Sequence, residues 1–587
     1  MSLQRSNLDE GSASCRPPQE LEDELTLTRL PRRALVFLLY DPEGICDPSV
    51  IHTLKGFRPF VEEILVVSNG YLQPESRSAV AKVADQVLER PNTGYDVGAY
   101  RSAFDHFGWN RLAEFDELIL ANYTFFGPVG SFGELFERMA KDPADFWGIT
   151  NHPSITPHPY TGKGTMPEHL QSYWLVFRRP LLTSNEFRDY WERLPLPKSY
   201  SDVVTLFECQ LTEHFSQLGF SWSAAFPAQH YGVQNPTMEA PLALLQDGCP
   251  LFKKRLYFHD VPALAAAGVF SGAVTKSALQ RGYPPNLIID GVARRATARE
   301  LSLGMNATFV VPQDEISSDH EANQGVPPPS LRIEVIESRP WKRLAAESLD
   351  AVLGDAQILV VNRPGPAPHD LGDNEVTGFA NARAAIVDNA TFVAETFQNN
   401  PRLAALFPYA QFLSEPVSGR SWFSRSETAR TIASELGVHG PFSHSSVLGP
   451  WRGFGAYRRP LLEKIQSLIE AAGWKRLVDI AGDEESLSRS LDLLAADIAK
   501  DLEMVVGQAA TADELRASAT LMQDLFSRKR VIYPDYLDYP YSGRVIVPSL
   551  KNRVGSVIKS ASPTLFESLH NVELQSRAVR ERLRRRR

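Results

Sequence analysis

The 587-residue sequence predicts an α/β protein whose N-terminal part is built on a parallel sheet. Short apolar runs alternate with helical stretches between residues 34 and 122, which is the pattern of a parallel α/β fold. The first run, at 34–40, is almost wholly apolar, as expected of a strand that is buried on both faces. The length also exceeds the roughly 250–300 residues at which a single hydrophobic core stops growing, so more than one domain is expected.

Each predicted strand of the N-terminal part is an apolar run bounded by turn residues. The first four strands are expected at residues 34–40, 63–69, 85–91 and 115–122. Helices are expected at residues 75–84 and from residue 101 onward. Beyond them we expect strands at 145–150 and 172–179, separated by a loop rich in His, Pro, Gly and Thr, and then a helix at 203–217.

A polar, acidic stretch at residues 312–330, which ends in three prolines, separates the two halves of the chain. The predicted organisation is a disordered N-terminus at 1–30, a first α/β domain at 31–305, an acidic, proline-rich linker at 306–330, a second, smaller and degenerate α/β domain at 331–475, and a helical region with a basic tail at 476–587. Apolar residues at three- and four-residue spacing predict the helices of the last region.

The two halves share a pattern that indicates an internal duplication. In both, an apolar run is followed by an aromatic run that ends in Arg-Arg-Pro-Leu-Leu, at residues 178–182 and again at 458–462. Coincidence is the alternative explanation.

Composition narrows the class of protein. The net charge is −9, from 61 Lys and Arg against 70 Asp and Glu, which argues against broad nucleic-acid binding. Cys15, Cys46, Cys209 and Cys249 are far apart and have no zinc-type spacing, which fits a reducing compartment. The N-terminus has no signal-peptide core, and no run of about 18 apolar residues occurs. We therefore expect a cytoplasmic protein.

The strongest local signal is the stretch RPNTGYDVGAY at residues 90–100, directly after the third predicted strand. Ligands of open α/β sheets bind at the carboxyl ends of the strands. Gly94 and Gly98 allow a ligand to approach the backbone closely. Asn92 and Asp96 offer hydrogen-bond acceptors, and Tyr95 lies between these two in the sequence. The alternative is an ordinary strand-to-helix turn with Asp96 as its N-cap.

Polar residues also end the first two predicted strands. Tyr40 and Asp41 follow the first strand, and Asn69 ends the second. Because the carboxyl ends of parallel strands meet at one edge of the sheet, we expect these residues and the 90–100 loop to face one crevice. Taken alone, Asp-Pro and Asn-Gly are turn dipeptides. The junction at residues 40–44 is not the glycine-rich fingerprint of dinucleotide or adenosyl-methionine enzymes, which remain a less favoured class.

Several segments together resemble a known bacterial family. The stretches NTGYDVGAY, FDELILANYTFFGP, SYWLVFRRPLL, FECQLT and KKRLYFHD are similar to the rhamnan-synthesis protein F family over roughly residues 33–300, and a looser similarity covers 385–465. The family is associated with rhamnose-rich cell-wall or lipopolysaccharide glycans and is regarded as glycosyltransferases. The resemblance implies a GT-A-like first domain that moves a sugar, rhamnose among the candidates, from a nucleotide-sugar donor to a growing polysaccharide or lipid-linked glycan.

The loop after the fourth strand departs from the pattern of GT-A enzymes. Those enzymes place an Asp-x-Asp there, whose carboxylates hold Mg²⁺ or Mn²⁺ against the donor diphosphate. This chain has Asn122 and Tyr123 instead, so the use of Mg²⁺ or Mn²⁺ is open. A cation such as Arg101 or Lys163 is the alternative counter-charge, and loss of activity is another. A silent glycan-binding or scaffolding relative is therefore the second candidate.

Glycosyl transfer with inversion needs a carboxylate that removes the proton of the acceptor hydroxyl. Glu208, in the apolar helical stretch at 203–217, is the first candidate for this base, and Asp202 is the second. A helix-terminal acid or a structural ion pair is the alternative role.

Two further expectations concern the second half. It has no counterpart of the 90–100 motif, so we expect it to be non-catalytic. The tail carries seven arginines in its last 16 positions and predicts either peripheral attachment at the inner face of the plasma membrane or a solvated helix end.

Overall fold

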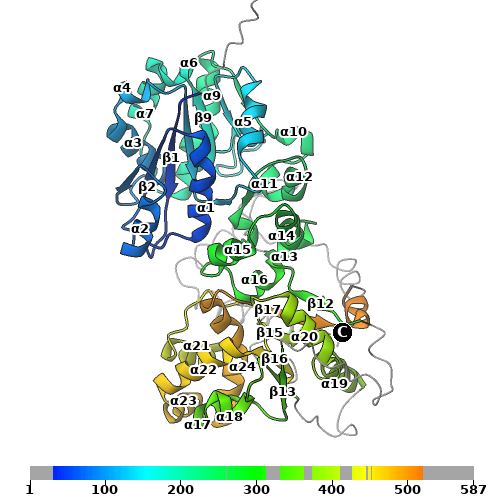
Figure 1. Ribbon diagram of the computed structural model, residues 1–587. Coiled ribbons are helices and arrows are strands. Elements are labelled where there is room, and N and C mark those ends of the chain that lie inside the picture. The colour runs from blue at the N-terminus through cyan, green and yellow to red at the C-terminus, as the bar shows by residue number, and fades with distance from the viewer. Residues whose placement is uncertain are drawn as a thin grey trace, which may run out of the picture.

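The computed structural model describes residues 31–259, 261–312, 331–362, 373–409, 426–443, 447–450 and 453–519. They form two α/β units, one above the other in Figure 1. The predicted disorder at 1–30, most of the linker and the basic tail fall outside these residues. Among the described residues, no helix combines the length and the apolar character needed to cross a membrane.

The first unit contains a seven-stranded sheet in the order β10-β6-β9-β4-β1-β2-β3. The strands β1 (Arg33–Leu39), β2 (Glu63–Ser68), β3 (Gln86–Glu89) and β4 (Glu117–Asn122) are parallel. Strand β9 (Trp174–Arg178) runs antiparallel between β4 and β6 (Phe146–Gly148), and β10 (Trp222–Ala224) is parallel to β6. The predicted α/β class and the parallel-dominated sheet are confirmed.

Helices bury both faces of this sheet, which explains why its strands are apolar on both sides. In β1, Leu35 and Phe37 pack toward one face and Val36 and Leu38 toward the other. The first face is covered by α1 (Pro48–Phe57), α2 (Pro74–Ala81) and α5 (Gly133–Ala140). The second is covered by α3 (Tyr95–Phe107), α4 (Trp109–Leu112), α6 (Arg179–Leu182), α7 (Asn185–Arg193) and α9 (Cys209–Gln217).

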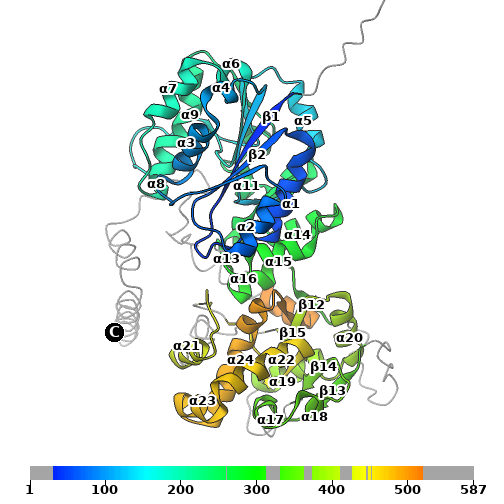
Figure 2. The ribbon, with the colours of Figure 1, turned by 60° about the vertical axis from the view of Figure 1, so that its left-hand side comes forward.

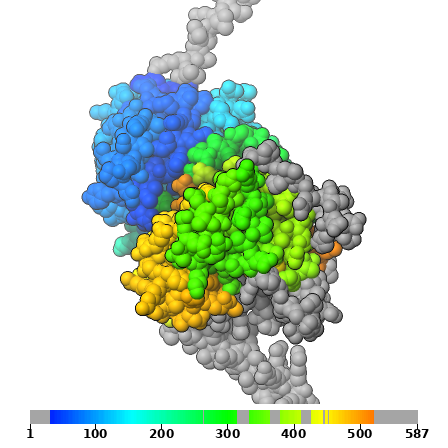
Figure 3. Space-filling model, turned by 60° about the horizontal axis from the view of Figure 1, so that its bottom comes forward, coloured from blue at the N-terminus to red at the C-terminus, as the bar shows by residue number. Residues whose placement is uncertain are grey.

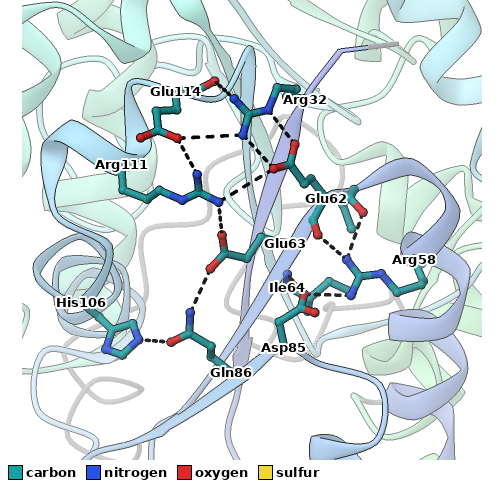
Figure 4. A network of polar contacts seen from close by, with 11 residues as sticks. Arg32, Arg58, Glu62, Glu63, Ile64, Asp85, Gln86, His106, Arg111 and Glu114 are labelled. Atoms are coloured by element: carbon teal, nitrogen blue, oxygen red, sulfur yellow. Dashed lines mark hydrogen bonds and ion pairs between the residues drawn. The ribbon is translucent and has the colours of Figure 1, made fainter.

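Charged residues join the starts of the parallel strands, at the amino edge of the sheet (Figure 4). Arg32 pairs with Glu62 at 2.7 Å, and Arg111 reaches Glu63 at 2.9 Å and Glu114 at 2.5 Å. Single exposed ion pairs contribute little, but a network with shared partners adds rigidity. Because this network occupies the amino edge, the opposite, carboxyl edge is left for a ligand.

The second unit contains a six-stranded sheet in the order β12-β17-β15-β16-β14-β13. Its strands are β12 (Thr308–Val310), β13 (Ile333–Ile336), β14 (Ile358–Val361), β15 (Leu403–Pro408), β16 (Gly455–Arg458) and β17 (Val505–Ala510). Its helices are α17 (Trp341–Ala346), α18 (Leu349–Leu353), α19 (Asp373–Ile386), α20 (Ala390–Asn399), α21 (Ser426–Glu435), α22 (Arg459–Ala472), α23 (Trp474–Ala481) and α24 (Glu484–Asp501).

The boundaries of this unit differ from the expected ones. Strand β12 lies in the segment expected to be linker, and β17 lies inside the region 476–587 expected to be helical. Both strands belong to the second sheet because β17 pairs with β15 on one side and with β12 on the other. The helices α23 and α24 accordingly pack into the core of this unit and form no separate region.

The two sheets repeat one arrangement of strands. In the first, β9 lies antiparallel between β4 and β6, and β10 follows β6. In the second, β16 lies antiparallel between β14 and β15, and β17 follows β15. The register also agrees, since Arg178 pairs with the first residue of β4 and Arg458 with the first residue of β14. The second sheet has one strand beyond β14, where the first has β1, β2 and β3.

The Arg-Arg pair of each repeat makes equivalent hydrogen bonds. Arg178 donates to the carbonyl of Met139 at the end of α5, and Arg458 donates to that of Phe397 at the end of α20. The next arginines, Arg179 and Arg459, donate to carbonyls two residues before β4 and β14 respectively. These matched contacts support the duplication that the sequence pattern indicates.

The units meet through the helices α13 (Val261–Ala266), α14 (Ser271–Gln280), α15 (Pro285–Val292) and α16 (Ala298–Gly304), which lie between the two sheets in Figure 2. Val505 of β17 packs in the apolar cluster of these helices. The buried Lys500 donates to the carbonyl of Ala296 at 3.2 Å. In Figure 3, which views the second unit end-on, α17 and α18 (green) lie beside α22 to α24 (yellow).

Replacing either repeat arginine by methionine tests the equivalence. We expect Arg178→Met and Arg458→Met each to lower the free energy of unfolding by about 2–4 kcal/mol, because part-buried carbonyls lose their charged donor. Chemical denaturation measures the loss. Arg188→Met removes an exposed i,i+4 pair and should change stability by less than about 0.5 kcal/mol. An unaffected Arg458→Met variant would contradict the structural equivalence.

Candidate functional site

A cavity of about 400 Å³ opens at the carboxyl edge of the first sheet. It is within the size range of ligand pockets, roughly 300–1,000 Å³. Eight of the residues expected to form a site line it, namely Tyr40, Asn69, Asn92, Tyr95, Asp96, Asn122, Tyr123 and Glu208. They come from the ends of β1, β2 and β4, from the loop before α3 and from the helical stretch after Ser199. The structure therefore brings the predicted strand-end loops to one cavity.

The loop between β3 and α3 is held by its glycines and by Arg90. Gly94 has φ +76° and forms the N-cap of α3, a conformation that glycine adopts without strain. A Cβ on Gly98 would lie 2.2 Å from the carbonyl oxygen of Thr93, so only glycine permits this close turn. Arg90 donates to the Asn69 side chain and to the Thr93 carbonyl, which ties the loop to the end of β2.

A chain of hydrogen bonds crosses the floor of the cavity from Lys253 to Asp96. The Lys253 ammonium donates to Thr124 Oγ1 at 2.9 Å, and that hydroxyl donates to Asn122 Oδ1 at 2.6 Å. The Asn122 amide then donates to Asp96 Oδ2 at 3.1 Å. Every member is oriented by its neighbour, so the amide of Asn122 has a fixed direction. This fixed direction is typical of a site built for a specific ligand.

Glu208 lies at the end of η2 (Val203–Glu208), a π-helical segment that leads into α9. Wide turns of this kind occur frequently at functional sites. The backbone N–H of Ser172 donates to Glu208 Oε2 at 2.9 Å, and the Ser172 hydroxyl donates to the same oxygen. Both bonds end on Oε2, which leaves Oε1 as the oxygen for a ligand hydroxyl.

Burial shifts two of the charged groups that face one another here. Desolvation raises the pKa of Asp96 to about 6, against the hydrogen bond from Asn122, which lowers it. Desolvation lowers the pKa of Lys253 to about 7, although Glu208 and Asp96 favour its charged form. The Lys253 ammonium also lies 3.6 Å from the centre of the Tyr173 ring, a cation–π contact. Perturbed groups that share a cavity mark a candidate functional site.

Other expected residues lie outside the cavity lining. Asp41 is buried, accepts bonds from the backbone of its own turn, and pairs with Arg294 at 3.0 Å. Asp202 closes a capping box with Ser199. Gly94 and Gly98 act through the backbone. Neither cation suggested as a counter-charge lines the cavity, since Arg101 donates to the carbonyl of Leu194 and Lys163 is exposed in the 151–168 loop.

The cavity also contains cations that the sequence reasoning did not assign to a site. Lys253, Lys254 and Arg255 reach it from β11 (Phe252–Lys253) and η3 (Lys254–Tyr257), and Arg295 from the turn after α15. The first three belong to the KKRLYFHD stretch, which was noted only for its family resemblance. Their arrival depends on the antiparallel pairing of β11 with β5 (Phe125–Phe126), two residues long and without a periodic signal.

The loop where GT-A enzymes hold Mg²⁺ or Mn²⁺, and for which the sequence left metal use open, does not suit a divalent cation in this chain. The two lone pairs of Asn122 Oδ1 accept from the backbone N–H and from the hydroxyl of Thr124, at 3.2 and 2.6 Å. The Lys253 ammonium is bonded to the same Thr124, so a positive charge already lies beside this loop. Within the described part of the chain, no cluster of three or more His, Cys, Asp or Glu residues is arranged to hold a metal.

A wider hollow, about 710 Å³, lies in the second unit between α17 and the start of α24. Its charged side chains pair with one another, for example Arg339 with Glu485 at 2.8 Å and Lys342 with Glu484 at 2.8 Å. It contains no counterpart of the hydrogen-bonded chain described above among the residues that line it. We therefore assign the site to the smaller cavity of the first unit.

Residues 64–337 match the family described as Rhamnan synthesis protein F. The match runs from β2 to the end of β13, and it includes the 90–100 loop, Asn122, Glu208 and the cations of the 253–255 run. It confirms the family resemblance of the first unit and its link to polysaccharide synthesis, while the looser similarity at 385–465 lies outside the match.

Relatives and solved structures resemble only parts of the chain. The uncharacterized protein y4gN of Sinorhizobium fredii is 25% identical over 193 residues, 32% of this chain and 48% of its own length. The virulence protein VirA of Vibrio anguillarum is 26% identical over 155 residues, 26% of this chain and 45% of its own length. The chain thus spans about half the length of these curated relatives.

The mannosyltransferase PcManGT of Pyrobaculum calidifontis, solved with GDP-Man and Mn²⁺, superposes with a TM-score of 0.22 at 14% identity, over 44% of this chain and 78% of its own. Residues 1–349 of S. aureus TarS superpose with a TM-score of 0.23 at 12% identity, over 47% of this chain and 71% of that one. At these scores, neither superposition supports a statement about function.

The close turn at Gly98 predicts a destabilising substitution. Gly98→Ala places a methyl group against the Thr93 carbonyl and should lower the free energy of unfolding by about 1–3 kcal/mol while displacing the loop that carries Asn92. Gly133→Ala, in the first turn of α5 with ordinary contact distances, is the matched control and should be neutral or slightly stabilising. Equal stability of the two variants, measured by urea denaturation, would contradict the crowding.

The lowered pKa of Lys253 predicts a pH-dependent cost of its burial. Below pH 7 the ammonium is charged in both the folded and the unfolded protein, so the free-energy cost of burying its charge is fully present. As pH rises from 7 toward 10.5, the folded protein releases the proton first, so the cost disappears. Lys253→Met should therefore raise the midpoint of thermal unfolding at pH 6 by more than at pH 9. A gain that does not change with pH would show that Lys253 is not desolvated.

Proposed function

We propose that the first unit is a glycosyltransferase that moves a sugar from a nucleotide-sugar donor to a glycan acceptor in the carboxyl-edge cavity. The observation that supports this most directly is the meeting of three strand-end loops with Glu208 in one cavity. The family match agrees with it, because that family is named for the synthesis of a polysaccharide. The fold alone would not suffice, since similar sheets serve many reactions.

The donor nucleotide is assigned to the side of the cavity formed by the ends of β1, β2 and β3. Tyr40 and Tyr95 offer rings for a base to stack on, and Asn92 offers an amide for base or ribose. Asn69 has a supporting role, because its amide donates to the carbonyl of Tyr95 at 3.0 Å and accepts from Arg90. It thereby fixes the loop on which the nucleotide would lie.

Glu208 is the proposed base, and Asp96 with Asn122 forms the opposite wall. The acceptor hydroxyl gives its proton to the Glu208 carboxylate while its oxygen forms a bond to the anomeric carbon of the sugar. The bond between that carbon and the diphosphate oxygen breaks, and the nucleoside diphosphate leaves with the electron pair. The two Ser172 bonds to Oε2 hold the carboxylate in place, as a base requires.

The identity of the sugar and of the acceptor is a finer proposal. The name of the family favours rhamnose as the transferred sugar and a bacterial cell-surface polysaccharide or lipid-linked glycan as the acceptor. For a lipid-linked acceptor, contact of the arginine-rich tail with the inner face of the membrane would bring the cavity near its substrate. That tail lies beyond the described residues.

The second candidate is a glycan-binding relative without activity. It is favoured by the neutral Asn122 and Tyr123 at the position where carboxylates would hold a metal. Turnover separates the two candidates. Only a transferase releases nucleoside diphosphate from a panel of nucleotide sugars, one of them a rhamnosyl donor, when acceptor glycan is present.

The roles of the two carboxylates predict different losses. Glu208→Gln should reduce turnover at least about 100-fold with little change in donor affinity, because only the transfer of the proton is lost. Asp96→Ala should abolish donor binding, because it leaves the Asn122 amide without its acceptor and opens the wall of the cavity. Nucleoside diphosphate release measures turnover, and calorimetric titration measures affinity.

Two variants on neighbouring positions control for loss of structure. Glu213→Gln replaces an exposed carboxylate of α9 and should leave turnover unchanged. Asp202→Asn removes a capping carboxylate outside the cavity and should affect stability more than catalysis. Full turnover in Glu208→Gln would refute the assignment of the base.

A further inference from the structure

The cavity contains more positive than negative side chains. Lys253, Lys254, Arg255 and Arg295 line it together with only two carboxylates, Asp96 and Glu208. The Lys254 ammonium is fully buried beneath the cavity. Its charge is compensated there by Asp47, which lies 3.5 Å away, and it also donates to the Ser49 hydroxyl. The other three cations therefore face a cavity whose own carboxylates do not balance them.

Arg255 is held by neutral and aromatic groups, whereas Arg295 has one aromatic contact and shares the Asp41 carboxylate with Arg294. Arg255 donates to the Tyr200 hydroxyl at 3.5 Å and lies within 3.1 Å of the His259 ring. Arg295 lies over the Tyr123 ring, 5.3 Å from its centre, and its nearest carboxylate is that of Asp41 at 3.5 Å. Aromatic and neutral supports orient a guanidinium without cancelling its charge.

We propose that Lys253, Arg255 and Arg295 bind the diphosphate of the donor in place of a divalent metal ion, so that this site works without one. The inference rests on the proposed function. It is carried by the position of the three cations around the loop Asn122 to Thr124, in which the side-chain oxygens of Asn122 and Thr124 are already occupied. A divalent cation would meet the Lys253 ammonium there and would find no carboxylate on the loop to compensate the repulsion.

The chemistry of the leaving group fits this set of donors. A diphosphate gains negative charge as the bond to the sugar breaks, and fixed N–H donors aimed at it stabilise that charge without reorganisation. Guanidinium groups match phosphate oxygens in a two-point geometry, and a lysine adds a point charge. The lowered pKa of Lys253 supports this role, because an anion beside it would draw a proton onto the amine, and affinity should fall as pH rises above 7.

Titration of the full chain with UDP, GDP and dTDP, in EDTA and in excess Mn²⁺, tests the proposal. We expect at least one nucleoside diphosphate to bind with the same Kd, within about twofold, in both buffers. Arg255→Gln and Arg295→Gln should each weaken that binding about tenfold, the scale of one charged hydrogen bond. Arg193→Gln, an exposed arginine of α7 paired with Asp189 at 3.0 Å, is the matched control and should bind normally.

The outcomes separate this inference from the proposed function. Binding that requires Mn²⁺, or that tightens tenfold or more with it, overturns the metal-free site but leaves a transferase. An equal loss of nucleotide affinity in Arg193→Gln would show an unspecific effect of charge and would also overturn the metal-free site. If none of the three nucleotides binds in either buffer while circular dichroism shows a folded chain, the proposed function itself fails.

Discussion

The burial of the Lys253 ammonium at the carboxyl edge of the first sheet determines how the polar side chains of the cavity are arranged. A charge without water is costly unless hydrogen bonds and opposite charges compensate it. Lys253 meets this condition only in part: it donates to Thr124, contacts the Tyr173 ring and faces Glu208 and Asp96, but desolvation still lowers its pKa to about 7. Because Thr124 passes the bond on to Asn122 and then to Asp96, the same constraint orders the whole floor of the cavity.

The duplication shows which parts of the fold serve structure and which serve the site. Both sheets retain the antiparallel strand with its Arg-Arg pair, whose bonds close the ends of neighbouring helices and loops. The second sheet lacks equivalents of two of the three strands β1 to β3, the part of the first sheet whose ends carry Tyr40, Asn69 and the Asn92 loop. It has kept the scaffold without the strands whose ends line the cavity.

The sequence predicted what local patterns encode. The first four strands are apolar runs long enough to be recognised, and the residues at their ends follow from topology, so Asn92, Asp96 and Asn122 were expected beside one another. The strand β17 was not expected, because its short apolar run follows directly on a long helix. The cationic residues 253 to 255 were missed for another reason. They lie about 130 residues after Thr124, and only the two-residue pairing of β5 with β11 brings them back.

The short pairing of β5 with β11 also links two unusual features of the site, the missing Asp-x-Asp and the buried Lys253. Its register sets Lys253 opposite Phe125, the Lys254 N–H donates to the Thr124 carbonyl at 3.0 Å, and the Lys253 ammonium donates to the Thr124 hydroxyl beside Asn122. A pair of carboxylates with a bound divalent ion at this loop would place that ion beside the Lys253 charge in a partly desolvated site, where repulsion is strong. In the metal-free site that we propose, the loop is neutral and the lysine supplies part of the charge that the ion would carry. The absence of Asp-x-Asp and the presence of Lys253 are therefore consequences of one electrostatic balance.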